Sequence, residues 1–244
     1  MIDITVIIPS KHERYLFKTV ADIQDAAESN IEVLVGRDEK EEIGQRAQMN
    51  KLARMAKGKY IMKTDAHCSF GAGFDAIMLE QIKDNQIMAP LMLPLDAEKW
   101  TVSPHNKMGS FAFDTQLVNH HVPLEGKKFI NKTMCLQGSC FLTLRDNYWN
   151  WNLCDESLGS WGQGVELGIQ AHKHGGECVT TRSTYYGHLF RHGEEDFPYK
   201  RKQAEIDKCH QKVVKKLKRK EIAGLIEEFD YPLDWNKKAV KALK

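Results

Sequence analysis

Residues 60–67 read Tyr60-Ile61-Met62-Lys63-Thr64-Asp65-Ala66-His67. The run Tyr60-Ile61-Met62 predicts a buried strand, and the segment Thr64 to His67 marks the carboxyl end of that strand. Upstream, Gln45 to Ala56 has helical spacing, and Gly58 stands where a helix stop is expected. A helix that leads into a buried strand is typical of a parallel α/β sheet.

The chain before this stretch repeats the pattern. Ile4 to Ile8 is a β-branched run stopped by the turn signal Pro9-Ser10, Tyr15 to Glu28 has a helical stripe, and Ile31 to Val35 is a second apolar run. These segments predict a βαβ unit. In open α/β sheets ligands bind at the carboxyl ends of the strands, so we expect the chemistry near residue 65.

The rest of the chain is less regular. We predict helices over 74–86 and 164–174, strands over 141–144 and 177–181, an irregular region over 87–132, and a basic helix over 200–220 followed by a helix over 222–229. The predicted organisation is an α/β domain over residues 1–199 with a basic helical extension over residues 200–244.

Composition places the chain among globular proteins. Of 244 residues, 42% are hydrophobic, 28% charged and 9% aromatic, enough apolar material for a sizeable core. The net charge of +2 hides an uneven distribution. Residues 200–220 carry ten Lys or Arg and two acidic residues, a balance of +8, so the other 223 residues carry −6.

Targeting signals are not evident. The longest apolar run, Ile87 to Leu95, contains two prolines and is shorter than the ~18–20 residues of a membrane helix. The first residues lack the basic region and cleavage site of a signal peptide. We expect a cytoplasmic protein without membrane contact, in the host cytoplasm if it is phage-encoded, with its six cysteines reduced. Its oligomeric state is open.

Asp65 and His67 form the first candidate site. Alternate residues of a strand project to one face, and a carboxylate with an imidazole is half of a divalent-cation site. In the alternative interpretation, Asp65 caps the next segment and His67 is merely polar.

Further segments strengthen the metal hypothesis. The run Thr5 to Ser10, the segment Val33 to Asp38, and Asn50 placed fifteen positions before Asp65 resemble the nucleotide-binding half of family 2 glycosyltransferases. The segment Asp65-Ala66-His67-Cys68, followed by Gly73-Phe74, is similar to the metal motif of one subgroup, the polypeptide N-acetylgalactosaminyltransferases.

The resemblance extends over roughly residues 4–199. Gln137 to Phe141 is similar to that group's glycine-rich strand, Trp161-Gly162 with Glu166 to its Trp-Gly-Gly-Glu segment, and Gly187 to Arg191 to its Gly-His-x-Phe-Arg motif. One departure is clear. Residues 163–166 are one position short of the family pattern and lack its first acidic residue, so only Glu166 is carried over.

The resemblance implies a GT-A fold with a mainly parallel central sheet, a UDP-sugar donor and a Mn²⁺ or Mg²⁺ ion. Such an ion neutralises the charge that develops on a departing diphosphate. The implied metal ligands are Asp65, His67 and His188. The implied nucleotide-binding residues are Pro9, Asp38, Arg46, Asn50, Asp65 and Gly138. The implied catalytic residues are Trp161, Glu166 and Arg191. The alternative for Arg46 is a solvated surface charge.

We therefore hypothesise a hexosyl- or N-acetylhexosaminyltransferase that acts on an acceptor hydroxyl. Its stereochemical outcome and catalytic base are open, although Asp155, Glu156 and Glu166 are available acids. The basic segment 200–220 favours DNA as acceptor, at a hydroxymethylated pyrimidine base, as in phage DNA modification. A Ser or Thr hydroxyl of a protein, or a glycan hydroxyl, is the alternative. A zinc hydrolase and a non-catalytic sugar-nucleotide-binding protein are the remote alternatives.

Overall fold

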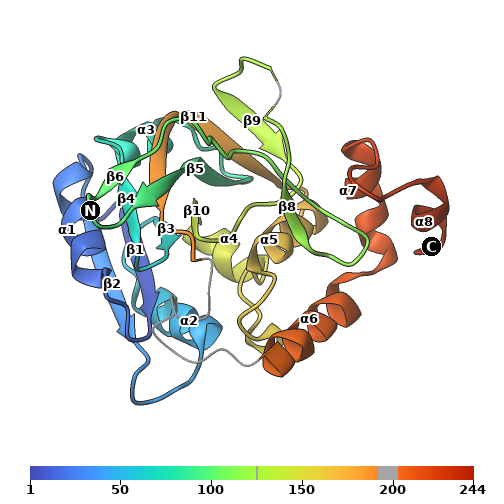
Figure 1. The fold of residues 1–244 in the computed structure, drawn as a ribbon, viewed down its shortest axis with the longest axis horizontal. Coiled ribbons are helices and arrows are strands. Elements are labelled where there is room, and N and C mark those ends of the chain that lie inside the picture. The colour runs from blue at the N-terminus through green and yellow to red at the C-terminus, as the bar shows by residue number, and fades with distance from the viewer. Residues whose placement is uncertain (125, 192–202) are drawn as a thin grey trace.

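A computed structural model describes residues 1–124, 126–191 and 203–244. Within these ranges, a nine-stranded sheet has the order β2-β1-β3-β10-β5-β11-β4, with β6 paired to β5 and β9 paired to β11 (Figure 1). The strands of the sheet are β1 (Ile4–Ser10), β2 (Ile31–Arg37), β3 (Tyr60–Thr64), β4 (Cys68–Phe70), β5 (Gln86–Asp96), β6 (Thr101–Val102), β9 (Ile130–Thr133), β10 (Cys140–Leu144) and β11 (Glu177–His188). A separate hairpin joins β7 (Phe111–Phe113) to β8 (Asn119–His121).

The sheet is mixed. The ladders of β1 with β2, β1 with β3, and β5 with β11 are parallel, whereas β10 runs antiparallel to both β3 and β5. The helices are α1 (Leu16–Ala26), α2 (Gln45–Met55), α3 (Phe74–Gln81), α4 (Arg145–Asn150), α5 (Gln163–Lys173), α6 (Gln203–Leu217), α7 (Ala223–Glu228) and α8 (Lys237–Lys241), with 3-10 turns η1 (Glu156–Leu158) and η3 (Lys220–Ile222). The α/β fold class predicted from the sequence is confirmed.

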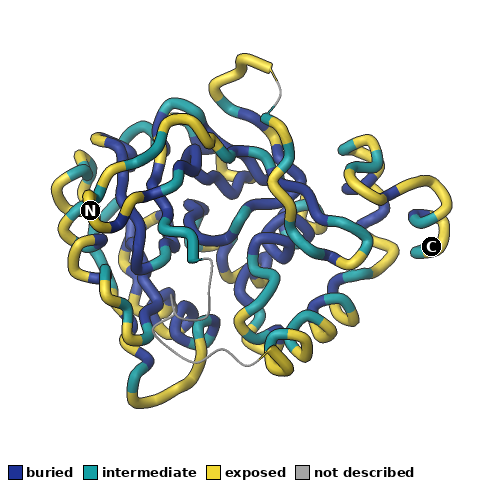
Figure 2. The backbone as a smooth tube through the Cα atoms, viewed as in Figure 1, coloured by how far each residue is buried: buried dark blue, intermediate teal, exposed yellow. Residues whose placement is uncertain are grey.

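Side-chain alternation along β1 shows how both faces of the sheet are covered. Ile7 packs in one cluster with Met49 of α2, whereas Val6 and Ile8 pack in the other with Ile23 of α1. A strand with helices on both sides must be apolar throughout, and all seven residues of β1 are buried. The buried strands form the interior of the molecule, while exposed residues gather on the outer helices and loops (Figure 2).

The prediction of an irregular segment from residue 87 is wrong, because β5 lies in the middle of the sheet. Pro90 and Pro94 share an edge of β5 with Met92, whose N–H donates to the carbonyl of Met108 at 2.9 Å. Amide groups alternate between the two edges of a strand. The missing N–H groups of the two prolines therefore face away from β11 and leave that parallel ladder intact.

Other predicted elements differ at their ends. Strand β1 continues through Pro9 to Ser10, past the last residue that pairs with β3, and β11 continues to His188 instead of ending at residue 181. The helix predicted over 74–86 ends at Gln81 because β5 begins at Gln86.

The C-terminal helices pack on the main core. Val213, Leu217, Ile226 and Trp235 are buried in the same hydrophobic cluster as Val6 and Ile8, and α6, α7 and α8 lie together beyond α5 on the right of Figure 1. The predicted domain boundary at residues 199/200 lies outside the described residues and stays a prediction. In the described ranges, no helix is both long and apolar enough to cross a membrane.

Candidate metal and nucleotide site

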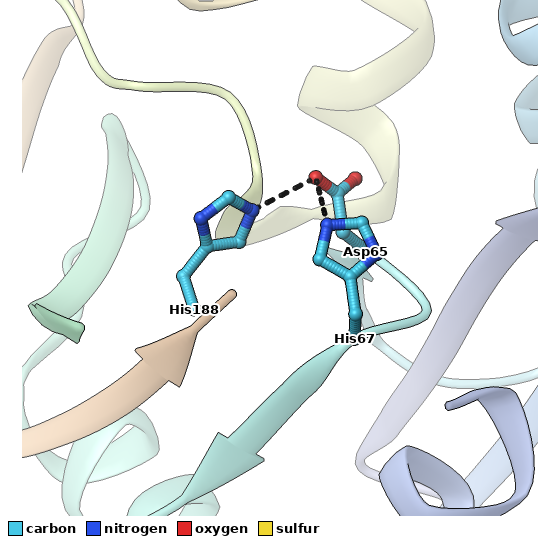
Figure 3. Close-up of side chains that lie close together, drawn as sticks. All are labelled: Asp65, His67 and His188. Atoms are coloured by element: carbon cyan, nitrogen blue, oxygen red, sulfur yellow. Dashed lines mark hydrogen bonds and ion pairs between the residues drawn. The ribbon is translucent and has the colours of Figure 1, made fainter. Parts of the chain in front are cut away.

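The three predicted metal ligands meet at one edge of the sheet. Asp65 follows β3 directly, His67 lies between β3 and β4, and His188 ends β11. Their candidate ligand atoms all lie within 4.8 Å of one another. One carboxylate oxygen of Asp65, Oδ2, is 3.3 Å from Nε2 of His188 and 3.9 Å from Nε2 of His67 (Figure 3).

Backbone contacts fix this meeting point. Strand β4 pairs antiparallel with β11, and Cys68 lies opposite His188. The N–H of Leu189 donates to the carbonyl of His67 at 3.2 Å, and the N–H of Asp65 donates to the carbonyl of Ser139 at 2.8 Å. The three predicted ligands are thus held by strands that come from distant parts of the chain.

Asp65 is held as a carboxylate. Burial raises the pKa of Asp65, but the Lys63 ammonium and the imidazoles of His188 and His67 more than offset that effect, so its pKa lies well below the ordinary value. The Lys63 Nζ donates to Oδ1 of Asp65 and to the carbonyl of Gly138, the latter at 2.9 Å. Sequence reasoning missed Lys63, although a lysine within an apolar strand was a signal for a buried charge.

Glu13 supports His67 from the other side. Its Oε2 atom lies 3.4 Å from Nδ1 of His67 and also accepts a hydrogen bond from Arg191. Burial raises the pKa of Glu13, and contacts with His67 and Arg191 lower it below its ordinary value overall. The Nη2 atom of Arg191 lies 3.2 Å from Nδ1 of His67. Sequence reasoning missed Glu13, and nothing in its spacing signalled it.

The donor set fits a divalent cation. One carboxylate oxygen and two imidazole nitrogens form a donor set that can hold a divalent transition-metal ion, and the Glu13 carboxylate beside His67 is the outer partner that such imidazoles usually have. Burial lowers the pKa of His188, with Asp65 acting in the opposite direction, and a neutral imidazole is the form that binds metal. Nδ1 of His188 is buried with no hydrogen-bond partner among the described residues.

Arg46 and Glu166 form a buried ion pair between α2 and α5. Arg46 also donates to the carbonyls of Gly159 and Trp161, and Glu166 accepts the N–H of Asp155 at 2.9 Å. The alternative of a solvated Arg46 is therefore wrong. Burial raises the pKa of Glu166 to about 7, against the effect of Arg46.

Asp38 and Asn50 are engaged by the protein itself. Asp38 accepts the N–H groups of Ile43 and Gly44, both at 2.8 Å, and so closes the loop before α2. Asn50 donates to the carbonyl of Cys154 at 3.0 Å and accepts from the Tyr148 hydroxyl at 2.9 Å. Their roles in nucleotide binding stay predictions.

The remaining predicted site residues occupy separate places. Pro9 lies near the end of β1, opposite Gly36 of β2. Gly138 precedes β10 with φ +97°, and a Cβ there would lie 3.0 Å from the nitrogen of Gly164. Trp161 packs its ring on His210 of α6, with ring centroids 4.3 Å apart.

Comparison with known proteins places this geometry in context. No family model matches the chain. A Drosophila melanogaster protein named putative polypeptide N-acetylgalactosaminyltransferase 13 is 25% identical over 158 residues, which cover 61% of this chain and 28% of that protein. The chain therefore spans under a third of the length of this curated relative.

Solved structures resemble the chain over nearly its whole length. A crystal structure of GalNAc-T7 with UDP, GalNAc and Mn²⁺ matches with a TM-score of 0.72 at 20% identity, over 99% of this chain and 53% of that one. The structure of Staphylococcus aureus TarS 1–349 in complex with UDP-GlcNAc matches with a TM-score of 0.56 at 11% identity, over 99% of this chain and 70% of that chain. The fold is that of the GT-A glycosyltransferases. Within this fold class, the chain is similar in sequence to one polypeptide N-acetylgalactosaminyltransferase and in structure to another.

Proposed function

We propose that the protein is a metal-dependent glycosyltransferase that transfers a hexosyl or N-acetylhexosaminyl group from a UDP-sugar to an acceptor hydroxyl. The observation that carries this proposal is the convergence of Asp65, His67 and His188 at one edge of a GT-A sheet. Ligands of open α/β sheets bind at such an edge. The similarity to a structure that contains UDP, GalNAc and Mn²⁺ supports it.

The chain's own residues would hold and orient the cation. Asp65 would contribute Oδ2, and His67 and His188 one nitrogen each, while Glu13 would keep His67 oriented. A bound Mn²⁺ or Mg²⁺ would act as a Lewis acid for the departing diphosphate. The bond from the anomeric carbon to the phosphate oxygen breaks, a bond to the acceptor oxygen forms, and the hydroxyl proton is released.

The test is UDP release from a panel of UDP-sugars with Mn²⁺ and candidate acceptors. We expect release by the wild type, none in excess chelator, and at least a hundredfold loss in Asp65→Asn. Asp25→Asn, a carboxylate-to-amide change at an exposed position of α1, is the matched control and should keep full activity. Absence of UDP release with every donor, together with metal-dependent ester or amide cleavage, would favour the zinc hydrolase. The anomeric configuration of the product decides between retention and inversion.

For the acceptor we propose DNA carrying a hydroxymethylated pyrimidine. Lys208, Lys212, Lys215 and Arg219 recur at helical spacing along α6 and just past its end, and all four are exposed, while Val213 and Leu217 of the same helix are buried. A basic stripe of this kind suits a phosphate backbone. Two further lysines are engaged within the protein, Lys216 by Asp155 and Lys218 by the carbonyl of Thr115. The basic residues 200–202 lie outside the described residues.

Charge reversal tests the acceptor better than truncation, because α6 contributes to the core. The triple variant Lys208→Glu, Lys212→Glu, Lys215→Glu should bind duplex DNA more weakly, with a salt dependence reduced by ~0.9 for each lost phosphate contact. Reversal of Lys237, Lys238 and Lys241 on α8 is the control. If mass spectrometry finds the transferred sugar on a protein or glycan hydroxyl and never on modified DNA, the DNA proposal fails.

A further inference from the structure

Lys63 places a buried ammonium group beside a predicted metal ligand. Lys63 is 1% exposed and lies in β3, a strand that pairs with β1 on one side and with β10 on the other. A charge buried this deeply is destabilising unless it is paired. Its two recorded acceptors are Oδ1 of Asp65 and the carbonyl of Gly138.

Asp65 therefore divides its two oxygens between different partners. Oδ1 accepts from Lys63, and Oδ2 faces the imidazoles of His188 and His67 at 3.3 Å and 3.9 Å. The oxygen that faces the imidazoles is the one available to a cation. A carboxylate held in this way offers one oxygen, in a fixed orientation.

Within the described ranges, the charges around the three predicted ligands cancel. Among the described residues, Asp65 is paired with Lys63, and the Glu13 carboxylate beside His67 is paired with Arg191. With neutral imidazoles, these four charged groups sum to zero. A divalent cation bound alone would leave two uncompensated positive charges in a mostly buried site, because His67 and His188 are both buried.

A nucleoside diphosphate supplies the missing negative charge, since each of its phosphates is ionised near neutral pH. We propose that Lys63 couples the binding of a divalent cation to the binding of a diphosphate. By neutralising Asp65, it makes the site bind the cation weakly alone and tightly together with the diphosphate. Lys63 is a positioning residue in this account. The inference rests on the proposed function, because it takes Asp65, His67 and His188 as the metal ligands. Coupling of this kind is reciprocal, so the cation tightens nucleotide binding by the same factor.

The test measures the Mn²⁺ dissociation constant of the protein from the electron paramagnetic resonance signal of free Mn²⁺, with and without UDP, after correction for the Mn²⁺ that UDP chelates in a titration without protein. In the wild type, UDP should tighten Mn²⁺ binding at least tenfold. In Lys63→Met, Mn²⁺ alone should bind at least tenfold more tightly than to the wild type, and the factor by which UDP tightens Mn²⁺ binding should be at least threefold smaller than in the wild type. Lys63→Arg keeps the charge and should keep the coupling.

Folding of each variant is checked by circular dichroism, and Lys63→Gln replaces Lys63→Met if the latter does not fold. Coupling in the neutral variant equal to that of the wild type would overturn the inference, and so would a wild type that binds Mn²⁺ equally with and without UDP. Both of those results leave the proposed function standing. A wild type that binds no Mn²⁺ even with UDP present would overturn the proposed function and this inference together.

Discussion

The carboxylate of Glu13 lies 3.4 Å from Nδ1 of His67, while the opposite ring nitrogen of His67 faces Asp65 at 3.9 Å. The imidazole is therefore held between two carboxylates that come from different loops. In metal sites, an outer carboxylate of this kind fixes the tautomer and orientation of the imidazole and raises its basicity.

Loss of the outer carboxylate should weaken metal binding. We expect Glu13→Gln to raise the Mn²⁺ dissociation constant, measured in the presence of UDP, by roughly 10–100-fold. Glu80→Gln, at an exposed position of α3, provides the same chemical change away from the site and should have no effect. Equal Mn²⁺ affinity in wild type and Glu13→Gln would contradict the role given to Glu13.

His188 should make the stability of the metal-free protein depend on pH. Burial lowers the pKa of His188 in the folded state, so the unfolded chain, with an imidazole pKa of about 6.5, binds the proton more readily. The stability that the neutral ring contributes is complete above that pH and is lost as the pH falls towards the folded-state pKa. From about pH 7.5 to about pH 5.5, the free energy of unfolding measured by urea denaturation should therefore fall more for the wild type than for His188→Gln. The same pH dependence of the free energy of unfolding in both proteins would contradict this prediction.

The Arg46–Glu166 pair should be costly to break on one side only. Arg46→Met leaves the buried Glu166 carboxylate without its guanidinium partner, and we expect a loss of about 3–5 kcal/mol in the free energy of unfolding. The double variant Arg46→Met, Glu166→Leu removes both charges and should recover most of that loss. Since burial raises the pKa of Glu166 to about 7, the cost of Arg46→Met should shrink as the pH is lowered and the carboxyl is protonated. A double variant no more stable than Arg46→Met would contradict the account.

Gly164 should not tolerate a side chain. A Cβ at this position would lie 1.9 Å from the carbonyl oxygen of Leu136, a backbone atom next to the segment that carries Gly138. We expect Gly164→Ala to lower the free energy of unfolding by about 1–3 kcal/mol or more. Gly224→Ala is the control. Gly224 is exposed in α7, and a Cβ there would lie 3.2 Å from Nε2 of the partly exposed His172 side chain, so alanine should change the free energy of unfolding by at most ~1 kcal/mol in either direction. Unchanged thermal stability of Gly164→Ala would refute the prediction.

The first half of the fold could be predicted from the sequence because its signals are local. Apolar runs and helical stripes alternate from Ile4 to Thr64, and the structure has β1, α1, β2, α2 and β3 there. Strand β5 was missed because prolines normally argue against a central strand, and their tolerance depends on which edge of the strand they face. Which edge the prolines face is decided by the pairing of β5 with β11 and with Met108, and the sequence of β5 alone does not reveal that pairing.

The site divides in the same way. Asp65 and His67 follow from strand alternation, whereas His188 could be found only through the resemblance of residues 187–191 to a known motif. Glu13 contacts His67 through tertiary structure, and its spacing carries no pattern. Lys63 contacts Asp65 from two positions away, and its place in an apolar strand was the one signal for it. Arg46 and Glu166 were predicted to bind the nucleotide and to act in catalysis, and no local signal indicated that they bind each other across 120 positions.

The order of strands in the sheet has a consequence for biosynthesis. Asp65 and His188 are 123 positions apart, and His188 reaches the site only when β11 has paired with β5 and β4. A nascent chain on the ribosome would expose Asp65 and His67 long before His188, the third predicted ligand, is translated. Mn²⁺ should therefore bind only after the sheet is complete, so that metal loading reports the end of folding rather than guiding its early steps.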